Sequence, residues 1–231
     1  MTSKKDIGIV MQNVAVFEEL TVYENINYFC GLYIKDNKER KRLVDEAIDF
    51  VGLNDFIKFH PKELSWGLLR RLNIACGIAH KPKLLILDEP TVAVDPQSRN
   101  KILEGIEELN RQGTTIIYTT HYMEEVEQIC TRIVIIDKGS VIASGTKEEL
   151  KDMVSIGEKI SIETTDIDAG QIEKIKGVID INTVEYKDDH LSIVSDKGKN
   201  NIVEVLNLLQ SEGIIYKRVY SELPTLNDVF L

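Results

Sequence analysis

Cysteine, proline and tryptophan are scarce in this sequence, which has three, five and one of them in 231 residues. Cys30, Cys76 and Cys130 are odd in number, lie far apart and form no C-x-x-C motif, so we interpret them as reduced thiols rather than a disulfide framework. No apolar run approaches the ~20 residues that a membrane-spanning helix needs, and residues 1–11 do not resemble a secretory signal. Any role at a membrane must therefore come through a partner.

Positive charge is also in deficit, since 28 Lys and Arg stand against 38 Asp and Glu, giving a net charge of −10. Non-specific binding of nucleic acid needs a positive surface, so this balance disfavours a nucleic-acid partner. A nucleotide ligand remains open, because Mg²⁺ and oriented backbone N–H groups can neutralise one triphosphate locally. The hydrophobic content of 43% is ordinary for a globular chain, which has room for one large domain or two smaller ones.

Hydrophobic patterning predicts a parallel α/β sheet. Apolar runs at 84–87, 115–118 and 133–136 are too continuous for half-exposed strands, and a helical stretch separates the first two. A further short strand is expected at 7–11. Strands buried on both faces and alternating with helices are typical of such a sheet.

A mainly helical region of about residues 20–80 is predicted between the first two strands. Thr21-Val-Tyr-Glu has the capping-box pattern that opens a helix, and Gly52 is a natural end for the next one. Ser65 precedes a third helix. Its hydroxyl either caps that helix or, together with the N–H of Gly67, binds an anion at the helix N-terminus.

The pattern changes near residue 150. From residue 158 to 231 the predicted order is strand, helix, strand, strand, helix, strand, which is the βαββαβ order of a ferredoxin-like domain. We therefore expect two domains, residues 1–150 and residues 158–231, the second a small α+β accessory domain in which no residue stands out as a site.

Polar side chains follow the predicted strands where each one ends. Asp88 and Glu89 come directly after 84–87, His121 follows the strand around 115–118, and Gln12 follows the first strand. Since the carboxyl ends of parallel strands open onto one crevice, these side chains can reach one ligand. A carboxylate pair there can hold Mg²⁺ through its water shell and orient an attacking water.

Asp88, Asp95 and His121 also have structural interpretations. Asp88 with Pro90 suits an ordinary polar turn. Asp95 before Pro96 suits a helix entrance, and a lone histidine such as His121 is more often structural. The order and spacing of the segments, rather than any one of them, carry the prediction.

Taken in order, the segments resemble the ATP-binding subunit of an ABC transporter over essentially the whole chain. The resemblance assigns each candidate to a motif of that family: Gln12 to the Q-loop, Ser65 and Gly67 to the signature motif, Asp88 and Glu89 to Walker B, Asp95 to the D-loop and His121 to the switch histidine. It implies Asp88 and Gln12 as indirect Mg²⁺ ligands, Glu89 as general base, and His121 as a contact of the γ-phosphate.

The resemblance also implies ligands and partners. These are ATP and Mg²⁺, transmembrane permease subunits, and a second ATP-binding subunit, with the chain in the cytoplasm on the inner face of the cell membrane. Phe17–Asn25, the βαββαβ part and Pro224–Phe230 are similar to the exporter branch that moves drugs, antibiotics or surface polymers.

Two departures from the family pattern stand out. The phosphate-binding loop G-x-x-x-x-G-K-[ST] (Walker A) occurs nowhere, and only residues 1–6 precede the first predicted strand, so we expect an N-terminally truncated, incomplete core. In the family the strand bearing that loop lies beside Walker B, and without it 84–87 should lose cover. Trp66 stands where the family has glycine, and its bulk should obstruct a close backbone approach.

Three functions follow as hypotheses. The first is an ATP-hydrolysing exporter subunit whose missing front is supplied by a longer gene product, this chain being a fragment with impaired activity. Whether the chain alone is an ATPase is left open. The second is a degenerate, non-hydrolysing regulatory or structural subunit. The third, a soluble cassette protein acting on ribosomes or DNA, is disfavoured by the acidic balance. The transported substrate cannot be read from the sequence.

Overall fold

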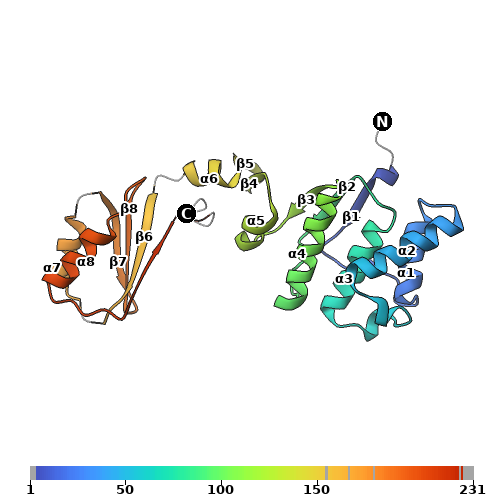
Figure 1. Cartoon of the computed structure of the whole chain (residues 1–231), viewed down its shortest axis with the longest axis horizontal. Helices are drawn as coiled ribbons and strands as arrows, with labels where there is room; N and C mark the ends of the chain where they lie inside the picture. The colour runs from blue at the N-terminus through green and yellow to red at the C-terminus, as the bar shows by residue number, and fades with distance from the viewer. Residues whose placement is uncertain (1–3, 154–155, 166, 179, 224, 226–231) are drawn as a thin grey trace. The chain divides into compact units, whose positions relative to one another are not determined.

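The protein is described by a computed structural model that places residues 4–153, 156–165, 167–178, 180–223 and 225. The chain divides into two compact units, Met1–Cys130 and Thr131–Leu231, which we describe one at a time (Figure 1). The division falls before residue 150, the end expected for the first domain, because residues 131–150 group with the second unit. Of the segment Pro224–Phe230, all but Thr225 lies outside the described residues.

The first unit contains a short parallel sheet and a group of helices. Its elements are η1 (Lys4–Asp6), β1 (Ile7–Val10), α1 (Val22–Gly31), α2 (Asn37–Val51), η2 (Asn54–Phe56), η3 (Pro61–Glu63), α3 (Trp66–Ile78), β2 (Leu84–Asp88), α4 (Pro96–Arg111), β3 (Thr115–Thr119) and α5 (Met123–Ile129). The strands pair in the order β1-β2-β3, all parallel. The predicted α/β class is therefore confirmed.

The strand β2 is the centre of this sheet. It pairs with β1 on one side and β3 on the other, and Leu85 and Leu87 are fully buried. The expectation that a further strand lies directly beside 84–87 is wrong, because both edges of β2 are already hydrogen-bonded. The strand therefore keeps both strand neighbours and one covered face, whereas Leu84 and Ile86 on its other face are only half-buried.

The strand β3 differs from its prediction. It alternates rather than being buried on both faces: Ile116 and Tyr118 pack against the core, whereas Ile117 is 48% exposed. The continuous apolar pattern therefore overstated its burial.

The helices α1, α2 and α3 enclose a core of their own, in which Val22, Ile26, Val44 and Leu72 are fully buried. Both predicted helix signals are confirmed. Thr21 and Glu24 form a reciprocal capping box at the start of α1. The left-handed Gly52, at φ 66°, ends α2.

The second unit begins with a hairpin. β4 (Ile133–Asp137) pairs antiparallel with β5 (Ser140–Gly145), so the expectation that 133–136 joins the parallel sheet is wrong for the described residues. Lys138 and Gly139 both have positive φ, 47° and 81°, as a two-residue hairpin turn requires. This turn returns the chain onto the preceding strand.

The rest of the second unit has the predicted βαββαβ order. After α6 (Lys147–Met153) come β6 (Ile156–Glu163), α7 (Ala169–Lys176), β7 (Ile181–Lys187), β8 (His190–Asp196), α8 (Ile202–Ser211) and β9 (Arg218–Glu222). The sheet order β7-β8-β6-β9 is antiparallel throughout. Both helices lie on one side of it (Figure 1) and share its apolar core, so the ferredoxin-like prediction is confirmed.

Candidate functional site

Three predicted site residues meet at the carboxyl edge of the parallel sheet. Gln12 Nε2 donates to Glu89 Oε2 at 3.2 Å, and His121 Nδ1 lies 3.1 Å from Glu89 Oε1. Asp88 ends β2 beside them, where its Oδ1 accepts a hydrogen bond of 2.6 Å from the Thr119 hydroxyl. Residues 12, 89 and 121 are far apart in sequence, so the sheet topology alone brings them together.

The backbone at Glu89 is unusual. Its φ is 43°, in the left-handed region that non-glycine residues rarely adopt. The Glu89 N–H is directed at Thr119, with distances of 3.1 Å to the carbonyl oxygen and 3.2 Å to the hydroxyl. Strained residues of this kind persist where the surroundings over-determine them, and they concentrate at functional sites.

A buried arginine hydrogen-bonds to the backbone at the same edge of the sheet. Arg70 on α3 is 1% exposed and donates to the carbonyl oxygens of Met11 (3.1 Å) and Glu89 (3.4 Å). Burial lowers the pKa of Arg70, while the nearby charge of Asp88 raises it. Because one guanidinium contacts the residue before Gln12 and Glu89 itself, α3 fixes the ends of β1 and β2 relative to each other.

The other predicted site residues form a second group. Ser65 caps α3, its hydroxyl accepting from the N–H of Leu68 at 3.3 Å, and Asp95 caps α4 by accepting from the N–H of Ser98 at 2.9 Å. Both helix-cap interpretations are therefore realised. Among the described residues, no hydrogen bond or ion pair joins Ser65 or Asp95 to Glu89 or His121.

Gly67 lies where these two caps approach each other. A Cβ at this position would lie 2.6 Å from Ser98 Oγ and 3.1 Å from Asp95 Oδ2, so only glycine allows the contact. Trp66, 46% exposed, donates from its indole nitrogen to the carbonyl oxygen of Val92 at 3.3 Å. The predicted signature and D-loop segments are thus in direct contact.

The charge state of Asp95 follows from its capping role. The hydrogen bond from the Ser98 backbone, followed by that from the Ser98 side chain, lowers the pKa of the Asp95 carboxyl. Asp95 therefore stays ionised to a lower pH than an ordinary aspartate does.

Oxygen donors at the strand ends suit Mg²⁺ better than a softer metal. No group of three or more His, Cys, Asp or Glu within the described ranges could enclose a metal ion. Mg²⁺ usually keeps several waters and binds one or two carboxylates together with substrate phosphates. The Asp88 carboxylate and the Gln12 amide oxygen therefore fit this ion as indirect ligands when a nucleotide supplies the rest.

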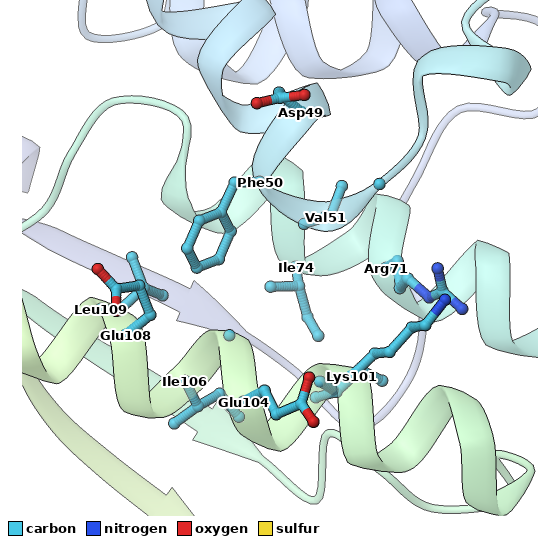
Figure 2. A pocket seen from close by; sticks show the side chains of 13 residues that line it. Asp49, Phe50, Val51, Arg71, Ile74, Lys101, Glu104, Ile106, Glu108 and Leu109 are labelled. Carbon is cyan, nitrogen blue, oxygen red and sulfur yellow. The ribbon is translucent and has the colours of Figure 1, made fainter.

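A separate cavity of about 490 Å³ lies between α2, α3 and α4 (Figure 2). Phe50, Ile74 and Leu109 supply apolar walls, and Arg71 and Lys101 lie at one end. None of the predicted site residues lines it. The cavity is therefore distinct from the group formed by Gln12, Asp88, Glu89 and His121, which we call the strand-end cluster.

Comparison with known proteins agrees with this geometry. Residues 1–92 match the ABC transporter family, and residues 145–231 match the C-terminal domain of DrrA1-3-like ATP-binding proteins. The chain is 32% identical over 227 residues to the daunorubicin resistance ATP-binding protein DrrA3 of Streptomyces coeruleorubidus, covering 97% of this chain and 71% of that protein. This chain belongs to the ATP-binding proteins of ABC transporters.

Other ABC proteins give the same result. The linearmycin resistance ATP-binding protein LnrL of Bacillus subtilis (strain 168) is 41% identical over 191 residues, which are 83% of this chain and 61% of LnrL. The ATP-binding cassette MJ0796, solved as a dimer with ADP and Pi, is similar with a TM-score of 0.57 and 27% identity, covering 62% of this chain and 64% of that one. The chain thus spans 61% and 71% of the two resistance proteins.

The family binds ATP and works with membrane permeases, and its cassettes dimerise. In the part of this ABC protein that the structure describes, no helix is long and apolar enough to cross a bilayer.

Thr119 and Arg70 were not among the predicted site residues. Thr119-Thr120 directly precedes His121, and two hydroxyls at the carboxyl end of a strand were a usable signal. Arg70 gave none, because a helix with adjacent Arg70 and Arg71 normally exposes both. Its burial depends on carbonyl groups that only the folded chain brings within reach.

Proposed function

We propose that the chain is the ATP-binding subunit of an ABC exporter, coupling ATP binding and hydrolysis to transport through partner membrane subunits. The observation that carries this proposal is the convergence of Gln12, Glu89 and His121, beside Asp88, at the carboxyl edge of the parallel sheet. Open α/β sheets bind ligands at this edge. The chain's similarity to drug and antibiotic resistance proteins supports a drug or antibiotic as the exported molecule.

Each residue has a role that its contacts support. Glu89 is the general base, held by Gln12 and His121 so that a carboxylate oxygen can orient the attacking water. His121 faces Glu89 through Nδ1, so Nε2 is the ring nitrogen that would have to donate an N–H to the γ-phosphate. Bound Mg²⁺, reached through water by Asp88 and Gln12, would neutralise charge on the phosphates.

The signature group serves a second subunit in this proposal. Ser65 and Gly67 at the start of α3, with Asp95 beside them, would close over nucleotide held by a second ATP-binding subunit. The N-terminus of the 13-residue α3 favours an anion. Trp66 obstructs this approach unless its bond to Val92 turns the indole aside.

The partners and domains complete the proposal. The proposed partners are transmembrane permease subunits and a second ATP-binding subunit. The chain itself would lie in the cytoplasm, on the inner face of the cell membrane. Residues 1–150 form the ATP-binding domain and residues 158–231 the accessory domain.

Activity of the 231-residue polypeptide alone should be impaired. It contains no G-x-x-x-x-G-K-[ST] loop to supply backbone N–H groups and a lysine to the β- and γ-phosphates. Each charge-assisted hydrogen bond lost costs about 1.5–3 kcal/mol, so several together move the Kd for ATP by orders of magnitude. The alternative is a degenerate, non-hydrolysing regulatory or structural subunit, which the same missing loop favours.

Calorimetric titration with Mg-ATP tests this proposal. We expect this polypeptide alone to bind in the millimolar range or weaker, and binding to weaken further when Asp88 is replaced with alanine. Micromolar binding by the chain alone would show that this chain holds the phosphates of ATP without such a loop. Weak binding that is unchanged by Asp88→Ala would remove the strand-end cluster from the nucleotide site.

A further inference from the structure

Next to the strand-end cluster lies a carboxylate that the proposed mechanism does not use. Glu125 on α5 is fully buried. Its Oε1 accepts from the Thr91 hydroxyl at 2.6 Å and pairs with Arg99 Nε at 2.8 Å. Its Oε2 accepts from the hydroxyls of Tyr118 at 2.7 Å and Thr120 at 2.9 Å. Four donors match the acceptor capacity of one carboxylate.

The four donors come from three segments that border the candidate site. Thr91 lies two residues after Glu89, Tyr118 and Thr120 lie on the segment that leads into His121, and Arg99 lies on α4. Because a buried charge is stabilised only by the partners that surround it, these segments cannot shift independently without leaving it unpaired.

The turn at His121 is held by the same group. The Thr120 hydroxyl, which donates to Glu125, also accepts from the N–H of Tyr122 at 3.0 Å. The centres of the Tyr122 and His121 rings are 4.1 Å apart, and the Arg99 guanidinium lies 5.1 Å from the centre of the Tyr122 ring. Contacts from Glu125 therefore reach both residues that flank His121.

One of the four donors is the Tyr118 phenol. Burial is the largest effect and raises the pKa of the Tyr118 phenol, as does its hydrogen bond to Glu125. The phenol therefore keeps its proton to a higher pH than an ordinary tyrosine does.

We propose that Glu125 is a positioning residue that couples the Glu89–Thr91 segment to His121, setting the geometry in which His121 meets Glu89. Its effect on ATP hydrolysis rests on the proposed function, whereas the coupling itself does not. Glu125 touches no reacting atom in this scheme and acts through Thr91 and Thr120.

The coupling can be measured in the nucleotide-free chain by NMR. The chain has four histidines, so the His121 ring Cε1–H signal can be assigned from its loss in His121→Gln. We expect Thr91→Val to shift this signal, because the lost hydroxyl acts on His121 through Glu125. The same substitution in a Glu125→Gln background should add little, since residues in one network are non-additive.

Exchange of the Tyr122 amide hydrogen gives a second readout. We expect Glu125→Gln to accelerate it by about tenfold or more, because the Thr120 hydroxyl loses its fixed orientation. Glu124→Gln is the matched control: this neighbour is 87% exposed and contacts Arg99 only at 3.4 Å, so exchange should not change. Val44→Ala, buried in the separate helical core, controls for stability alone.

Each outcome decides. An unmoved His121 signal in Thr91→Val, or equal shifts in both backgrounds, overturns the coupling, as does a Val44→Ala variant that moves the signal equally. Should Glu125→Gln not fold, Thr91→Val by itself still decides. Absence of ATP binding would count against the proposed function but would leave these signals, and this inference, unaffected.

Discussion

Replacing Gly8 with alanine should disrupt the close packing of β1 against α3, which positions the strand-end cluster. A Cβ at residue 8 would lie 2.4 Å from the carbonyl oxygen of Gly77 and 2.8 Å from Cγ of Pro82. The first is a backbone atom and the second belongs to a ring, so no side-chain rotation relieves the clash. Restoring a contact of 3.0 Å requires a shift of 0.6 Å (3.0 − 2.4) between β1 and α3.

The magnitude follows from packing. Overfilling a close-packed interior costs about 1–3 kcal/mol, and we expect the upper end because two backbone segments must separate. With a urea m-value of about 2 kcal/mol/M, the unfolding midpoint should fall by about 1.5 M. The hydrogen bond from Arg70 on α3 to the carbonyl oxygen of Met11, which follows β1, should weaken as well.

Fluorescence of Trp66 during urea unfolding provides the assay. It is the chain's one tryptophan and lies in the first unit, so its signal reports that unit. Gly31→Ala is the matched control, since its Cβ meets only the flexible Arg40 side chain, at 3.3 Å or more, and should change stability by less than about 1 kcal/mol. A Gly8→Ala midpoint equal to that of the parent would refute the reasoning.

Two further predictions concern thiols and acid. Cys30 and Cys76 are buried, and burial raises the pKa of both thiols. Both should therefore resist alkylation at pH 8 until urea unfolds the chain, whereas rapid labelling of the native protein, followed by mass spectrometry, would contradict their burial. The lowered pKa of Asp95 means that its contribution to stability is complete above the ordinary aspartate value of about 3.9 and is lost as pH falls through the folded-state value. The difference in unfolding free energy between the parent and Asp95→Ala, measured by urea unfolding, should thus be constant from pH 7 to 5 and shrink in stronger acid. A difference that widens in acid would contradict a lowered pKa for Asp95.

Local signals were the most predictable part of the fold. Thr21 and Gly52 begin and end their helices as expected, because capping depends on residues within one turn. The βαββαβ order also followed from periodicity. Pairing was less predictable. The run at 133–136 looked like another parallel strand, and only the positive φ of Lys138 and Gly139 turns it into a hairpin.

The candidate site was predictable in part. Gln12, Asp88, Glu89 and His121 could be identified because each follows an apolar strand, and parallel strands share one carboxyl edge. The hydrogen-bond partners could not. Arg70 braces the site through carbonyl groups 59 and 19 residues away in sequence, a contact that no local pattern encodes.

The most direct test concerns Glu89 in a chain that is supplied, ahead of Lys4, with a segment bearing a G-x-x-x-x-G-K-[ST] loop. We predict Mg-dependent ATP turnover by this extended chain, and Glu89→Gln should abolish that turnover while the Kd for Mg-ATP stays within a few-fold of the parent's. Turnover that survives Glu89→Gln, or an extended chain that binds no Mg-ATP, would contradict the assignment of the strand-end cluster to ATP hydrolysis.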